Sequence, residues 1–337
     1  RYSRHRWTVL KLPPRRMERR LTAAANWFSE QLSRHWVGRL DLLFTSEAMN
    51  LASLLRLMPQ LAPYPSVVYF HHNQLPDLSS RLSGREDSPL DLVNLNTAQA
   101  ATEIWFNSAY HRQTFMILAQ ALVARYPELS ARDPMPGVAA KVRTFAPPID
   151  LNVVHGLAAG EPIARDPRTV YVETRDADVS LLNAAVVRLR QLNVPIRFVT
   201  VGPVVSLDPG VDRLTVSEYD EVGQARAMLG AGIVLSVKPE AAIDHQVVRA
   251  LAAGCRPVLP AGGVYPELLP EKLHKSCLYD VFPDRLADKL SVVTGPSAVP
   301  WRPEDARPAL RPFDPMAQCR AIDERIEQIV AQNPGPG

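Results

Sequence analysis

The sequence predicts an α/β fold with two doubly wound parallel sheets, each in a domain of its own. Short apolar runs alternate with segments of helical periodicity, which is the pattern of strand–helix–strand units in a parallel sheet. This alternation stops near residue 150 and restarts near residue 168. The chain of 337 residues is long enough for two domains of ordinary size.

The elements of the first domain, residues 1–150, follow from apolar runs for strands and from polar capping residues for helix starts. The expected strands are Trp7–Leu12, Asp41–Phe44, Ser66–Phe70, Glu103–Phe106 and Val142–Phe145. The expected helices are residues 16–36, a segment from a Thr45 or Ser46 cap to about Leu61, residues 90–102, and a helix after Asn107-Ser108.

A linker is expected at residues 151–167, because the segment lacks a strong period and contains two glycines and two prolines. The second domain, residues 168–293, is expected to hold strands at Thr169–Val172, Ile196–Val201, Arg213–Val216, Gly232–Ser236 and Arg256–Leu259, and helices at 178–192, 220–230 and 241–253. Residues 294–337 are expected to form a proline-rich tail and a closing helix, roughly 316–331, that packs on the first domain.

The composition is that of a globular protein, with 46% hydrophobic and 22% charged residues, and it excludes bulk disorder. No apolar run approaches the ~18 residues of a membrane helix, so no membrane partner is expected. The three cysteines have no metal-ligand spacing and indicate buried or free thiols in a reducing compartment. We therefore expect a cytoplasmic protein without a bound metal.

Basic residues gather at the start of the chain. Residues 1–40 hold ten Lys or Arg and two Glu, although the net charge of the whole chain is only +3. Such an arm attracts a polyanion such as RNA through phosphate contacts, and the candidates are Arg15, Arg16, Arg19 and Arg20. The alternative is a solvated, arginine-rich helix face.

Polar motifs directly follow several of the expected strands. Because an open α/β sheet places its ligand at the carboxyl ends of its strands, these motifs are the candidate site. They are Tyr69-Phe70-His71-His72-Asn73-Gln74-Leu75, Phe106-Asn107-Ser108-Ala109-Tyr110-His111, and the loop Pro260-Ala261-Gly262-Gly263-Val264-Tyr265-Pro266-Glu267.

These motifs are similar to those of the tRNA-queuosine α-mannosyltransferase family. The family has a His-Glu-Asn-Gln-Leu motif where this chain has His71-His72-Asn73-Gln74-Leu75, and a Phe-Asn-Ser element that matches Phe106-Asn107-Ser108. Three further matches are Phe44-Thr45-Ser46 with Asn50-Leu51, Ala252-Ala253-Gly254-Cys255-Arg256-Pro257, and Val264-Tyr265-Pro266-Glu267.

The resemblance implies a GT-B fold of two Rossmann-like domains and a retaining transfer of mannose from a nucleotide sugar to queuosine-modified tRNA. GDP-mannose would be the donor, with no other cofactor. His71 and His72 would be catalytic. The substrate-binding residues would be Asn73, Gln74, Asn107, Ser108, Arg175, Glu240, Gly262, Gly263, Tyr265 and Glu267. Each has an ordinary structural alternative, such as turn chemistry for the Asn and Gly residues.

The chain also departs from the family. It begins at what would be the second strand of the fold, so the first sheet is expected to lack one strand. The family's two glutamates, spaced eight positions apart, fall on Ala241 and Arg249, with Glu240 one position early and Asp244 in place of a glycine. The family has cations after the strand that follows the linker. This chain has three acidic residues there, and Arg175 is the single basic residue among them. GDP-mannose binding is expected to be weaker by ~3–6 kcal/mol.

Three functions remain open from the sequence. The first is an active glycosyltransferase, favoured by the matching motifs after the strands. The second is a catalytically degraded relative that keeps the fold and binds RNA or a partner, favoured by Arg249. The third is a GT-B enzyme with a different donor. The oligomeric state is not indicated by the sequence.

Overall fold

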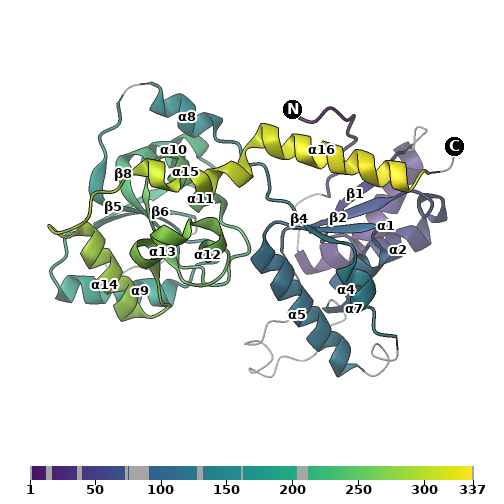
Figure 1. Cartoon of the computed structure of the whole chain (residues 1–337), viewed down its shortest axis with the longest axis horizontal. Helices are drawn as coiled ribbons and strands as arrows, with labels where there is room; N and C mark the ends of the chain where they lie inside the picture. The colour runs from purple at the N-terminus through teal and green to yellow at the C-terminus, as the bar shows by residue number, and fades with distance from the viewer. Residues whose placement is uncertain are drawn as a thin grey trace. The chain divides into compact units, whose positions relative to one another are not determined.

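The computed structural model of the chain describes residues 2–12, 17–35, 40–72, 75, 91–126, 132–160, 162–202 and 212–335, with the backbone alone at 17–22, 35, 91 and 212. The chain divides into two compact units (Figure 1). Unit 1 holds residues 1–147 and 316–337, and unit 2 holds residues 148–315. The expected α/β fold with two parallel sheets is confirmed.

Unit 1 is a parallel sheet of four strands with helices on both faces. Its strands, in spatial order, are β1 (Leu43–Ser46), β2 (Ser66–Phe70), β3 (Glu103–Phe106) and β4 (Val142–Thr144). Its helices are α1 (Met17–His35), α2 (Leu51–Leu57), η1 (Pro59–Leu61), α4 (Asp91–Ala100), α5 (Ala109–Arg125), α7 (Met135–Ala139) and α16 (Pro315–Gln332).

The core of unit 1 follows the two-residue period of its strands, since successive side chains point to opposite faces of a sheet. Val68, Phe70, Ile104 and Phe106 pack with residues of α4, α5 and α7 on one face. Val67, Tyr69 and Trp105 pack with Ile326 and Ile329 of α16 on the other. The two central strands, β2 and β3, are buried on both faces, which explains why they read as continuous apolar runs.

The closing helix α16 packs on unit 1, as the sequence predicts, and is fastened there by a buried ion pair. Arg325 on α16 donates from Nε to both carboxylate oxygens of Glu103, at 3.0 Å each, and its Nη2 donates to Glu103 as well. Glu103, only 5% exposed, also accepts a hydrogen bond of 2.6 Å from Trp105 Nε1. The helix is therefore held both by apolar contact and by a charged bond into the sheet.

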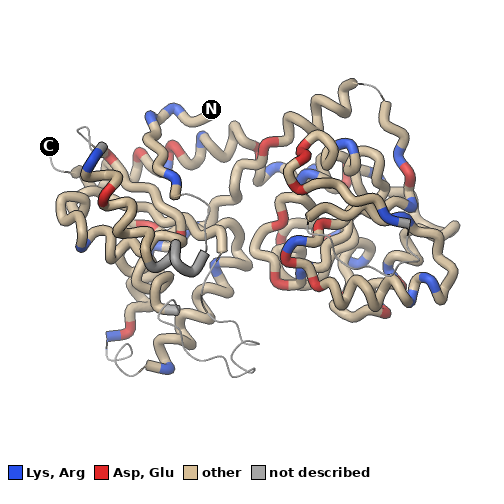
Figure 2. Tube along the Cα trace, turned by 180° about the vertical axis from the view of Figure 1, so that it is seen from behind, with Lys and Arg blue, Asp and Glu red and all other residues tan. Residues whose placement is uncertain are grey.

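The strand predicted at Trp7–Leu12 is wrong, because residues 2–12 form no strand, and the start of this segment instead bonds to α16. Ser3 Oγ and the Arg4 amide donate to the buried carboxylate of Asp323 at 2.7 and 2.8 Å, and Arg4 donates twice to Glu327. Figure 2 shows Lys and Arg positions near the start of the chain beside Asp and Glu positions of this helix. Trp7 adds an edge-to-face contact with Phe44. The hydrogen bonds that Ser3 and Arg4 donate therefore go to a helix rather than to a neighbouring strand.

Unit 2 contains a parallel sheet of six strands. Its strands, in spatial order, are β10 (Leu278–Tyr279), β9 (Arg256–Pro260), β8 (Ala231–Leu235), β5 (Asp166–Glu173), β6 (Arg197–Val201) and β7 (Asp212–Val216). Its helices are α8 (Asn152–Ala158), α9 (Val179–Gln191), α10 (Glu221–Gly230), α11 (His245–Ala252), α12 (Tyr265–Leu268), α13 (Glu271–Cys277), α14 (Pro283–Thr294), η2 (Pro303–Ala306), α15 (Arg307–Leu310) and η3 (Arg311–Phe313).

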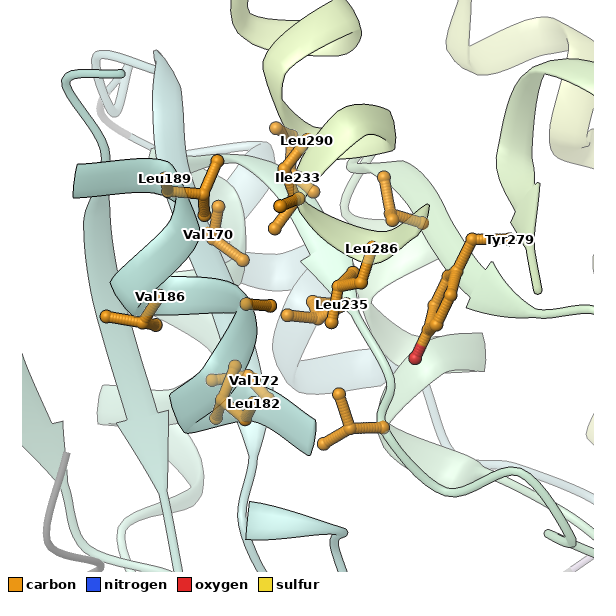
Figure 3. Packing of buried hydrophobic residues seen from close by; sticks show 14 of the residues in the cluster. Val170, Val172, Leu182, Val186, Leu189, Ile233, Leu235, Tyr279, Leu286 and Leu290 are labelled. Carbon is orange, nitrogen blue, oxygen red and sulfur yellow. The ribbon is translucent and has the colours of Figure 1, made fainter. Parts of the chain in front are cut away.

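The core on one face of this sheet joins β5 and β8 to α9 and α14 (Figure 3). Val170 and Val172 of β5 lie with Ile233 and Leu235 of β8 under side chains of the two helices. The helical residues of this cluster include Leu182, Val186, Leu189, Leu286 and Leu290. Their spacing of three and four positions is that of an apolar helix face, which is why α9 could be predicted.

Three other expectations for this part of the chain need correction. The segment 151–167, expected as a linker, contains helix α8, which packs on α10 within unit 2. The helix expected at 241–253 begins only at His245, because Asp244 caps it. The proline-rich segment after residue 294 forms short helices, since proline is well tolerated in a first turn. In the described part of the chain, no helix combines the length and apolar character needed to cross a membrane.

Candidate functional site

A buried carboxylate organises the carboxyl end of the sheet in unit 1. Glu47 follows β1, and its two oxygens accept hydrogen bonds from the backbone amides of His71 and His72 at 3.2 and 3.1 Å. Because β1 and β2 are parallel and adjacent, both segments leave the sheet at the same edge. The two histidine side chains are exposed there. The backbone of the His71-His72 motif is thus fixed while its side chains remain accessible.

The second element at this edge is the segment after β3. The buried amide of Asn107 donates from Nδ2 to the carbonyl oxygen of His71 at 2.9 Å. Its Oδ1 lies 2.9 Å from His111 Nδ1. Ser108 caps α5 by accepting from the His111 amide at 3.0 Å. Asn107 therefore ties the end of β2 to the first turn of α5, so both predicted residues lie beside His71.

Both His71 and His111 are held in the neutral form. The ring of His71 lies against that of Tyr69, with centroids 4.7 Å apart, and is exposed on its other side. The partial loss of hydration lowers the pKa of His71, with Glu47 opposing this and His72 adding to it. Burial lowers the pKa of His111 to about 3, with further contributions from the charges of His72 and His71. Because the Asn107 oxygen can only accept, the proton of His111 is on Nδ1. Its buried Nε2 has no hydrogen-bond partner among the described residues.

This burial predicts a pH dependence for the stability of unit 1. The unfolded chain protonates His111 near its ordinary pKa of about 6.5, whereas the folded chain does so only near pH 3. Stability is therefore complete above about pH 6.5 and falls as the pH is lowered. At pH 5 the loss is ~2 kcal/mol, from about 1.4 kcal/mol per pH unit.

Hydrogen exchange of the β2 and β3 amides, measured at pH values on both sides of 6.5, tests this prediction. In His111→Gln, which cannot take up a proton, the loss of protection on acidification should be smaller than in the parent protein. Equal losses in the two proteins would contradict the assignment. His72→Gln, which replaces an exposed histidine at the same edge of the sheet, is the matched control.

Several predicted residues of unit 1 lie outside the described structure. Asn73, Gln74, Arg15 and Arg16 are among the residues that are not described. Arg19 and Arg20 belong to α1, whose first turns are described by backbone alone. Their roles in substrate and RNA binding stay predictions.

In unit 2, two cations lie at the carboxyl end of β5, each paired with a carboxylate. Lys238, just beyond β8, donates to Glu173 at the end of β5, and both side chains are mostly buried. Arg175 lies two residues further along and donates to Glu218 at the surface. The Glu218 hydrogen bond raises the pKa of Arg175, and the charges of Glu218 and Glu173 contribute. The structure therefore adds one cation, Lys238, and one acid, Glu218, to this edge, so the expected excess of acid remains.

Tyr265 was expected to bind substrate, but its side chain is fully buried. Its hydroxyl donates to Asp244 Oδ2 at 2.9 Å and lies 2.5 Å from Ser236 Oγ. Asp244 Oδ2 also accepts from Ser236 Oγ at 3.0 Å, while its Oδ1 accepts from the Val247 amide at 3.1 Å. Tyr265 thus supports the start of α11, and its buried side chain is not accessible to a sugar.

The glycine loop after β9 is shaped by a close approach to another loop. A Cβ on Gly262 would lie 3.1 Å from the Pro239 carbonyl oxygen, and one on Gly263 would lie 2.9 Å from the same atom. Gly263 also has a φ of +62°, which L-residues rarely adopt. Both glycines are therefore explained by packing against the turn that contains Glu240. Glu240 and Glu267 are exposed.

Arg249, at the position of a family carboxylate, faces α10. Its Nη2 lies 3.3 Å from Glu221 Oε1, and it lines a small cavity together with Asp150, Gln224 and Val153. Within the described residues, no group of three or more His, Cys, Asp or Glu is arranged to hold a metal ion.

Sequence reasoning missed Glu47, His111 and Lys238 at these edges. Glu47 directly follows the predicted Thr45-Ser46 segment, and His111 ends the quoted Phe106–His111 motif, so position after a strand was a usable signal. Lys238 lies in the irregular segment after β8, so its position after a strand could also have indicated it. What the sequence could not show is which strand lies beside which.

Comparison with known proteins agrees with this architecture. Residues 1–149 match the family model described as tRNA-queuosine alpha-mannosyltransferase N-terminal. The tRNA-queuosine alpha-mannosyltransferase of Drosophila melanogaster is 22% identical over 283 residues, with 78% of this chain and 74% of the relative covered.

Solved glycosyltransferase structures share the fold of the chain. A sucrose-phosphate synthase from Thermosynechococcus elongatus matches with a TM-score of 0.64 at 13% identity, over 96% of this chain and 81% of that one. A trehalose 6-phosphate synthase from Burkholderia multivorans matches with a TM-score of 0.63 at 12% identity, over 96% and 78%. HepE from Anabaena, solved with UDP and glucose, matches with a TM-score of 0.57 at 15% identity, over 91% and 80%. The chain has the GT-B fold that the resemblance implies.

Proposed function

We propose that the chain is a glycosyltransferase that transfers mannose from GDP-mannose to queuosine-modified tRNA, with retention at the sugar. The observation that carries this proposal is the family match over residues 1–149, which spans the organised edge of unit 1. The Drosophila relative carries the corresponding name. A nucleotide-sugar donor is supported by HepE, which shares the fold and was solved with UDP and glucose.

The two sheet edges supply groups suited to this chemistry. In unit 1, Glu47 and Asn107 fix the backbone of His71, whose neutral imidazole can accept a hydrogen bond from a sugar hydroxyl or take a proton from it. In unit 2, Lys238 and Arg175 supply positive charge next to the strand ends. We accordingly propose that the acceptor binds at unit 1 and the donor diphosphate at unit 2.

A direct assay tests the proposal. The purified chain is incubated with GDP-mannose and with tRNA that does or does not contain queuosine, and the digested nucleosides are examined by mass spectrometry. We expect one hexose added to queuosine, and none on tRNA without it. Replacing GDP-mannose by other GDP or UDP sugars shows whether a different donor is used.

A second candidate, a relative that has lost catalysis, is favoured by Arg249. This side chain can only donate hydrogen bonds, and it pairs with Glu221 where the family has a carboxylate. Absence of transfer with every donor, together with tRNA binding that is lost on removing residues 1–20, would favour this candidate. Transfer of mannose to queuosine would exclude it. The cytoplasmic location expected from the cysteines stays a prediction.

A further inference from the structure

The Glu173–Lys238 pair lies at the point where the strand order of unit 2 reverses. From β5 the chain continues to β6 and β7 on one side of the sheet, and β8, β9 and β10 lie on the other side. The reversal is therefore between β5 and β8. In open α/β sheets, the crevice outside the carboxyl ends of the strands at such a point is where ligands bind. Glu173 ends β5 and Lys238 follows β8, so the pair occupies this position.

Two cations and a glycine turn lie near this edge, and they are the groups that an anion would contact. Arg175 is close enough to Glu173 for that carboxylate to help raise the pKa of Arg175. Gly202, just after β6, has a φ of +109°. A Cβ at this position would lie 3.2 Å from the backbone nitrogen of Arg175, so glycine leaves this amide uncovered. Two cations and a close glycine turn thus lie near the carboxylate of Glu173. Each cation is already paired with an acid, and Asp176 and Asp178 follow β5 as well, so the edge carries an excess of acid as it stands.

We propose that Lys238 is a diphosphate-binding residue of unit 2 and that Glu173 competes with the diphosphate for it. This inference rests on the proposed function for the choice of a nucleoside diphosphate as the ligand. A diphosphate presents several acceptor oxygens and more negative charge than a single carboxylate, so it can replace Glu173 as the partner of Lys238. Glu173 then loses its partner, which lowers the net affinity. Arg175 is the second cation, released from Glu218 in the same way.

The proposal predicts opposite effects for the two members of one ion pair. Lys238→Met removes the cation and should weaken binding of GDP about tenfold to a hundredfold, as expected for a charged hydrogen bond. Glu173→Gln keeps the shape but removes the competing charge, and should tighten binding by roughly threefold to tenfold. An ion pair with a purely structural role would give no tightening in either variant.

Calorimetric titration of the full chain with GDP, and separately with inorganic pyrophosphate, measures both effects. The matched control is the Lys272–Asp305 ion pair of unit 2, with the atoms 2.6 Å apart at the surface. Lys272→Met and Asp305→Asn should leave both affinities unchanged. Lys238→Arg retains the charge and should keep most of the affinity. Thermal unfolding of every variant establishes that it is folded.

The outcomes separate this inference from the proposed function. If folded Glu173→Gln binds GDP and pyrophosphate no more tightly than the parent protein, the inference is overturned. If the parent shows no measurable binding, Glu173→Gln should bring binding into range, and no binding in either protein also overturns it. The proposed function fails separately, through the absence of sugar transfer to tRNA, whatever these affinities are.

Discussion

Arg325→Ala is expected to lower the free energy of unfolding of unit 1 by about 3–5 kcal/mol, because it leaves a buried carboxylate without its partner. Glu103 is 5% exposed and is held by Arg325 and Trp105. The remaining cation, Arg143, lies 3.8 Å away on a half-exposed side chain and compensates only in part. Chemical denaturation, with hydrogen exchange of β3 and α16 to locate the effect, measures the loss.

The matched control is Arg4→Ala, which removes an ion pair with the same helix. Arg4 also bonds two oxygens of one carboxylate, that of Glu327, but both side chains are about half exposed. Water and salt screen such a pair, so its removal should have a much smaller effect. Adding Glu103→Gln to Arg325→Ala should restore part of the stability, since it removes the stranded charge. The explanation would be wrong if Arg325→Ala were no more harmful than Arg4→Ala.

The second large effect is expected for Asp244→Ala in unit 2, with a loss of about 2–4 kcal/mol. The change removes the cap of α11, worth about 1 kcal/mol. It also takes the shared acceptor from the buried hydroxyls of Ser236 and Tyr265. An unsatisfied buried polar group costs about 1–3 kcal/mol. Thermal or urea unfolding followed by hydrogen exchange of α11 checks the prediction.

Asp220→Ala separates capping from the buried network. Asp220 caps α10 in the same way, accepting from the Gly223 amide at 2.8 Å, but at an exposed position. Its replacement should cost only about 1 kcal/mol, the value of the cap alone. Tyr265→Phe combined with Asp244→Ala should cost less than the sum of the two changes, because they share one hydrogen bond. The buried hydrogen-bond network would be refuted if the stability losses of Tyr265→Phe and Asp244→Ala were additive. It would also be refuted if Asp220→Ala and Asp244→Ala cost the same.

The sequence predicted the strands that are buried on both faces and failed where the structure depends on distant contacts. The apolar runs Ser66–Phe70 and Glu103–Phe106 could be assigned directly, because burial on two faces leaves no polar position in the middle of a strand. Trp7–Leu12 has the same apolar character, but its neighbours bond to Asp323, more than three hundred residues away. Nothing local indicates that partner.

In the candidate site, too, local features could be predicted from the sequence and contacts between distant segments could not. Residues after strands could be named from the sequence, and Asn107 and His71 indeed meet through a hydrogen bond. The functions of Glu47 and Lys238 depend on β1 lying beside β2 and on β8 lying beside β5. Strand order is a property of the whole sheet, so it cannot be derived from the residues of either strand. Tyr265 failed for a different reason, since its burial is decided by Asp244 on another loop.

The division of the chain also sets an order in which its parts can be completed during synthesis. Unit 2 is one continuous segment, whereas unit 1 needs the residues after Pro315 to supply α16. A ribosome releases the first 147 residues early, and chains usually fold domain by domain from the N-terminus. The face formed by Val67, Tyr69 and Trp105 is therefore not covered by α16 until the residues of that helix have been made. Of the two units, the one whose synthesis begins first is completed last.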